Sequence, residues 1–130
     1  MGCNSAMNYN LTLSTLGHTW IFDIDGTIVI HNGYKQGGDR LLPGVKAFFD
    51  GLPVKDMIIF VTSRSEAARK ETETFLRTNG IRYDCIIFDA PPGERILVND
   101  DKPGGLATSL ALQTKRDKWA NIAVVEDESL

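Results

Sequence analysis

The 130-residue sequence lacks several features that mark other classes of protein. It has only two cysteines, Cys3 and Cys85, too few for a disulfide framework, so we expect a reducing compartment. No apolar run approaches the roughly 20 residues of a membrane span, and the first residues contain no signal-peptide core. Basic residues are not in excess either: 14 Lys and Arg stand against 17 Asp and Glu. We therefore expect a cytoplasmic chain that binds no membrane.

The same charge balance disfavours a nucleic-acid partner bound by bulk charge, since such proteins usually carry a basic face. It is compatible with a small phosphorylated partner, because one divalent metal ion can reverse the local field. The length fits one compact domain, and no repeat or low-complexity linker divides it. We expect residues 1–16 to be a loose N-terminal arm and residues 17–130 to form a single catalytic core domain.

Short apolar runs rich in β-branched residues predict strands at residues 18–22, 57–61, 85–88, 96–98 and 122–125. They lack polar alternation, which is typical of strands buried on both faces of a parallel sheet. Helical patterns follow Pro43, the capping box Ser63–Glu66, and Pro103. Strands alternating with helices predict an α/β fold, a Rossmann-like three-layer sandwich with a mainly parallel sheet. Residues 89–95 are too few for a parallel crossover, so either they cross the end of the sheet or a neighbouring run is an edge strand of different direction.

Polar residues follow three of these runs. The first leads into Asp23-Ile24-Asp25-Gly26-Thr27, which places two carboxylates at the carboxyl end of a strand. The second ends in Thr62-Ser63 before a helix, where free backbone N–H groups favour a phosphate. The fourth ends in Asn99-Asp100-Asp101-Lys102. Taken singly, these are also ordinary acidic turns and a helix cap. Taken together, the converging acids predict a hard divalent cation, Mg²⁺.

In order and context the three motifs resemble those of the haloacid dehalogenase superfamily of phosphotransferases. The resemblance implies a Mg²⁺-dependent phosphomonoester hydrolase in which Asp23 is the nucleophile that forms an aspartyl phosphate. It implies that Asp25 is the general acid/base and that Thr62 binds the transferring phosphate. The metal ligands that it implies are Asp23, Asp25, Asp100 and Asp101.

The chain departs from this family in one place. The family often has a Gly-Lys-Pro after the third strand, and here Asp89-Ala90-Pro91 stands instead. Lys102 is the first candidate for the missing catalytic cation and Arg95 is the second. The stretch around them resembles small members of the superfamily associated with capsular and lipopolysaccharide sugar biosynthesis. The residues expected to contact the substrate and its phosphate are Gly26, Thr27, Ser63, Arg64 and Arg95.

No segment is long enough for a cap domain, so we expect an open site on a sugar phosphate hydrolase, and the resemblance favours a homo-oligomer that covers it. Two alternatives stay open. A polynucleotide 3′-phosphatase shares these motifs but needs a basic track, and the candidate cations are scattered among acids. A catalytically inactive phosphate-binding relative is the other, because the usual lysine is missing. A phospho-receiver domain is disfavoured, since the last strand runs into Glu126-Asp127 and not into a lysine.

Overall fold

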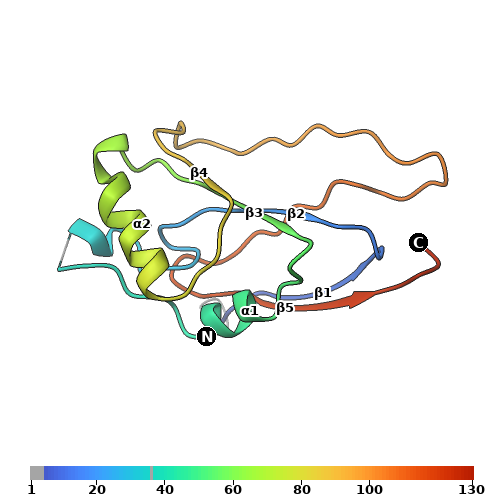
Figure 1. Ribbon diagram of the computed structural model, residues 1–130, viewed down its shortest axis with the longest axis horizontal. Coiled ribbons are helices and arrows are strands. Elements are labelled where there is room, and N and C mark those ends of the chain that lie inside the picture. Colours follow the sequence, from blue (N-terminus) through green and yellow to red (C-terminus); the bar gives the residue numbers. More distant parts are fainter. Residues whose placement is uncertain (1–4, 36) are drawn as a thin grey trace.

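The computed structural model describes residues 5–35 and 37–130. The strands are β1 (Asn8–Leu13), β2 (Thr19–Phe22), β3 (Met57–Val61), β4 (Cys85–Ile87) and β5 (Asn121–Glu126), and the α-helices are α1 (Val45–Asp50) and α2 (Arg69–Thr78). One sheet has the order β2-β3-β4 and a second pairs β1 with β5, and all the pairings are parallel (Figure 1). The predicted α/β class with parallel strands is confirmed, in two sheets. Among the described residues, no helix is both long and apolar enough to cross a membrane.

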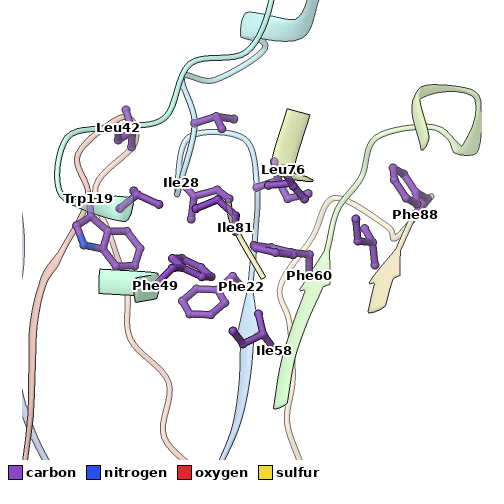
Figure 2. Close-up of a cluster of buried hydrophobic side chains, with 14 residues drawn as sticks. Phe22, Ile28, Leu42, Phe49, Ile58, Phe60, Leu76, Ile81, Phe88 and Trp119 are labelled. Atoms are coloured by element: carbon purple, nitrogen blue, oxygen red, sulfur yellow. The ribbon is translucent and has the colours of Figure 1, made fainter. Parts of the chain in front are cut away.

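One face of the β2-β3-β4 sheet forms the core. Neighbouring residues Phe22, Phe60 and Ile86 share a register across the three strands and are all buried. Phe49 of α1 lies against Phe22 and Phe60, with ring centroids 4.7 and 5.9 Å away (Figure 2). Trp119 closes this cluster from the segment before β5. Burying such aromatic side chains is the main source of stability in a small domain, so this face holds the strands in place.

The other face of the same sheet is exposed. Alternate side chains point outward, and Ile21, Met57, Cys85 and Ile87 are accessible to solvent. We call this surface the open face. The prediction of strands buried on both faces is therefore wrong for β2-β3-β4, and no third layer covers it among the described residues.

Three further predictions are wrong. Residues 8–13, expected within a loose arm, form β1 and pair with β5; residues 1–4 lie outside the described residues. The run at 96–98 is not a strand, and no helix follows Pro103. In place of both, residues 91–114 form an irregular, largely exposed excursion, which we call the exposed arm. Figure 1 shows it in orange as a long excursion that turns beyond the amino ends of β2 and β3.

A buried carboxylate ties the start of β2 to the turn before β3. The Asp56 side chain accepts hydrogen bonds from the indole N–H of Trp20 at 2.9 Å and the backbone N–H of His18 at 3.0 Å. The His18 ring nitrogen Nδ1 also lies 3.0 Å from Asp56 Oδ2. Burial acts to raise the pKa of Asp56, but these hydrogen bonds outweigh it and hold that pKa below its usual value.

Replacing Asp56 with Asn should lower the free energy of unfolding by about 1.5–3 kcal/mol near pH 7, because the donors lose a charged acceptor. The pKa of Asp56 is lower in the folded state, so its stabilisation is present above the unfolded pKa and is lost as the pH falls through the folded pKa. The difference in free energy of unfolding between wild type and the Asn variant should thus disappear below about pH 4. Urea unfolding at several pH values measures it, with Asp50→Asn, an exposed acid paired with Lys46, as the control. A difference in free energy of unfolding that persists in acid would contradict the stabilising role assigned to the Asp56 carboxylate.

Candidate functional site

The loop after β2 presents an accessible carboxylate. The side chain of Asp23 is 45% exposed, and its Oδ2 accepts a hydrogen bond from the Thr27 hydroxyl at 2.9 Å. Gly26 has a φ of 81°, a left-handed conformation that turns the loop back, and its N–H donates to the Val29 carbonyl. At the base of the exposed arm, Arg95 Nη2 lies 4.0 Å from Asp23 Oδ1. The first motif thus holds Asp23 in a fixed position that a ligand can reach, beside a cation.

Asp25, the second acid of the motif, is paired with Arg64. Arg64 Nε and Nη2 donate to the two carboxylate oxygens of Asp25, each at 2.9 Å. This is the two-point pairing in which a guanidinium binds a carboxylate most strongly. Both oxygens of Asp25 are therefore occupied by hydrogen bonds from Arg64 in this arrangement.

Arg64 is buried and saturated. Its side chain is 1% exposed, and Nη1 and Nη2 donate to Asp39 at 3.0 and 2.7 Å, while Nη1 also donates to the Thr72 hydroxyl at 2.8 Å. The Tyr34 ring stacks on the guanidinium at 4.1 Å. Burial acts to lower the pKa of Arg64, but the two carboxylates raise it above its usual value. All five N–H donors are occupied within the chain, so Arg64 has no free donor for a substrate in this arrangement, and its contact with substrate stays a prediction.

The hydroxyl of Thr62, in the second motif, is also bonded within the chain. Thr62 is buried, and its hydroxyl accepts a hydrogen bond from the backbone N–H of Arg64 at 3.0 Å. Ser63 is exposed, but the cap of the following helical turn is Ser65. Asp89 also accepts from the N–H of Glu66 at that turn. The turn that was expected to receive a phosphate is therefore capped by the chain's own oxygens, and Thr62 does not present its hydroxyl to a ligand here.

Asp100 and Asp101, the acids of the last motif, lie apart from the acids of the first motif. Asp100, Asp101 and Lys102 are on the exposed arm, where the Lys102 carbonyl accepts from Gly105 in the turn at its far end (Figure 1). No group of three or more His, Cys, Asp or Glu residues is placed to hold a metal ion within residues 5–35 and 37–130. The predicted cluster of Asp23, Asp25, Asp100 and Asp101 is not formed, so these residues do not fit a Mg²⁺ ion as they stand. Of the two candidate cations, the one that faces Asp23 is Arg95.

Sequence reasoning missed three residues that shape this region. Asp39 completes the pairing of Arg64, although no spacing links the two positions. Asp117 donates its N–H to the Gly26 carbonyl at 2.8 Å and accepts from the N–H of His31 at 2.7 Å. Arg116 packs on the same loop, since a Cβ at Gly26 would lie 3.3 Å from its Cγ. The one signal available in the sequence was the basic run Lys115-Arg116, which lies within the helical pattern expected after Pro103.

No protein-family model and no curated protein matches this chain. Among solved structures, the chain is similar to one in a Pnkp1/Rnl/Hen1 complex, with 27% sequence identity and a TM-score of 0.49. The similarity covers 63% of this chain and 31% of that one, so this chain spans about a third of its length. At that TM-score the similarity assigns neither a family nor an activity.

Proposed function

We propose that the chain is a phosphomonoester hydrolase of the haloacid dehalogenase type, with Asp23 as the nucleophile. The observation that carries the proposal is the setting of Asp23. It is an accessible carboxylate at the carboxyl end of a parallel strand, positioned by Thr27 and faced by Arg95. Ligands of open α/β sheets bind at this end of the strands, and a carboxylate beside a cation suits attack on a phosphate dianion.

The chemistry assigned to these residues has two steps. Asp23 Oδ1 attacks phosphorus, the bond from phosphorus to the alcohol oxygen breaks, and the alkoxide takes a proton from water. The hydroxide left by that water takes a proton from a second water as the second water attacks phosphorus of the aspartyl phosphate, which releases hydrogen phosphate and restores the carboxylate. Thr27 holds Oδ2 so that Oδ1 faces the substrate, and Arg95 offsets the charge that gathers on the phosphoryl oxygens.

Mg²⁺ and the acid/base role of Asp25 stay predictions of the sequence motifs. Asp25 would act as an acid or base only after its pairing with Arg64 opens, because Arg64 occupies both carboxylate oxygens. A hydrolysis assay run with Mg²⁺ and with a chelator decides whether the reaction needs the metal.

A sugar phosphate is the preferred substrate class. The alternative, a polynucleotide 3′-phosphatase, needs a continuous basic track. The candidate cations for such a track are Lys35, Arg40, Arg64, Arg69, Lys70 and Arg82. Of these, Arg64 is buried, Arg69 pairs with Glu66 and Glu73, and Arg82 donates to backbone carbonyls. Two cations favour a polyanion, Arg95 beside the open carboxylate of Asp23 and Arg116 against Gly26 of the following loop, so phosphorylated DNA ends belong in the assay panel.

Replacing Arg95 with Ala should lower kcat/KM by about 10- to 100-fold, because the cation facing Asp23 is lost. Lys102→Ala is the matched control and should leave the rate unchanged, since Lys102 lies at the turn of the exposed arm. Phosphate release from a panel of sugar phosphates, nucleotides and 3′-phosphorylated DNA measures both. If wild type hydrolyses no member of the panel, the enzyme proposal fails and the inactive relative is favoured. If Lys102→Ala is the damaging variant, the assignment of Arg95 fails.

A further inference from the structure

A turn of basic residues is fixed against the loop that carries Asp23. Residues 115–118 have the sequence Lys-Arg-Asp-Lys, and the N–H of Lys118 donates to the Lys115 carbonyl at 3.1 Å. We call these four residues the basic turn. They hold three cations and one acid, in a chain whose formal net charge is -3. We propose that the basic turn binds a second phosphate of the substrate, beside the one that Asp23 attacks, with Arg116 as its main contact.

Asp117 ties the basic turn to two segments of the candidate site. Its N–H donates to the Gly26 carbonyl at 2.8 Å, and its Oδ1 accepts from the backbone N–H of His31 at 2.7 Å. Its φ is 61°, a left-handed conformation that is strained for a residue with a side chain, although Asp tolerates it better than most. Such conformations persist where the surrounding contacts hold them, and they are common at functional sites. The basic turn therefore has a fixed position on the loop of the first motif.

Arg116 packs directly on that loop. A Cβ at Gly26 would lie 3.3 Å from Arg116 Cγ, and because glycine has no Cβ, the stem of the arginine packs on bare backbone. Gly26 is followed by Thr27, whose hydroxyl donates to Asp23 Oδ2 at 2.9 Å. The Arg116 side chain is therefore anchored next to the residue that positions Asp23.

The cations of the basic turn are open to a ligand. All three are exposed, and none of them forms an ion pair with a carboxylate in the part of the chain that the structure describes. By contrast, Arg64 and Arg69 each pair with two carboxylates. A guanidinium without a carboxylate partner can bind a phosphate at two points, and the neighbouring ammonium groups add attraction.

The positions of the two arginines indicate the class of substrate. Arg95 Nη2 lies 4.0 Å from Asp23 Oδ1, beside the phosphate that is cleaved, so a phosphate on Arg116 belongs to the leaving alcohol. That alcohol carries its second phosphate as a monoester, in a sugar or nucleoside bisphosphate, or as the neighbouring diester of a nucleic-acid end. The inference rests on the proposed function for the position of the cleaved phosphate.

Calorimetry on the full chain tests the second phosphate site without turnover. The Asp23→Asn variant should bind thymidine 3′,5′-bisphosphate at least about tenfold more tightly than thymidine 3′-phosphate, because the added phosphate meets the basic turn. Adding Arg116→Met should lower this affinity ratio to about twofold or less, since the charge is lost while the stem can stay on Gly26. Arg77→Met, the same change at an exposed arginine of α2, is the matched control and should keep the ratio. Equal affinity for the two ligands, or a ratio that Arg116→Met leaves unchanged, would overturn the proposal.

A 3′-phosphorylated thymidine oligonucleotide distinguishes the two sources of the second phosphate. Tighter binding of the oligonucleotide than of the bisphosphate identifies a nucleic-acid end, and the opposite order identifies a small bisphosphate. Either order supports the site if Arg116→Met weakens the tighter ligand, and overturns it if that variant does not. Hydrolysis is measured separately on wild type. A binding preference without hydrolysis supports the second phosphate site and contradicts the proposed enzyme, whereas hydrolysis without a preference does the reverse.

Discussion

Arg64→Met is expected to lower the free energy of unfolding by about 3–5 kcal/mol, because it removes one partner of a buried ionic cluster and leaves the others unpaired. Asp39 has a side chain only 6% exposed, and Asp25 is also largely shielded from solvent. Without the guanidinium, two carboxylates face one another at low accessibility. A domain of this size has only about 5–15 kcal/mol of stability in total, so the loss should be visible as a large drop in the urea midpoint.

Arg69→Met is the matched control for this prediction. Arg69 also pairs with two carboxylates, those of Glu66 and Glu73, but its side chain is 39% exposed and the pairs lie in water. Exposed ion pairs contribute little to stability, so this variant should unfold at nearly the wild-type urea concentration. Equal losses in the two variants would show that the burial of Arg64 is not what makes its pairing important.

Replacing the whole cluster separates charge from packing. In the triple variant Arg64→Met, Asp25→Asn and Asp39→Asn no unpaired charge is left, so part of the lost stability should return. If the triple variant is no more stable than Arg64→Met, the cost arises from lost packing against Tyr34 and Thr72 and not from unpaired charge.

The parallel strands could be predicted because their signal is local. The run 57–61 is apolar throughout and rich in β-branched residues, and it forms β3 at the predicted place. The same signal failed at 96–98, since an apolar run of three residues does not show whether anything covers it. The strand β1 was missed although Tyr9, Leu11 and Leu13 alternate with more exposed polar residues, which is the period of a half-buried strand.

The site was only partly predictable for a different reason. The accessible carboxylate of Asp23 follows from a motif of adjacent residues. The pairing of Arg64 with Asp39 joins positions 25 residues apart on different loops, so no spacing in the sequence indicates it. Convergence of Asp100 with Asp23 was inferred from a strand at 96–98, and that inference failed with the strand. Contacts within one loop are therefore readable from sequence, whereas contacts between loops depend on how the elements pack.

Asp23→Asn should abolish phosphate release, with a loss of at least about 10³-fold in kcat, because an amide does not form an acyl phosphate. The substitution keeps the size of the side chain and an oxygen that can accept from Thr27, so the loop should keep its shape. Binding of inorganic phosphate, measured by calorimetry, should accordingly persist. Acid quenching during turnover should trap a phosphoenzyme that hydroxylamine cleaves in wild type and that is missing from the variant.

Asp50→Asn is the matched control, since it makes the same change at an exposed acid on α1 and should hydrolyse at the wild-type rate. A kcat for Asp23→Asn within about tenfold of wild type would contradict covalent catalysis at this residue, because no other group replaces a lost nucleophile at so small a cost. An Asp25→Asn variant shows whether Asp25 acts by pairing with Arg64 or by transferring a proton. If Asp25 acts only by pairing with Arg64, its replacement should weaken stability while the dependence of kcat on pH keeps its shape. If Asp25 transfers the proton, one limb of that pH profile should disappear.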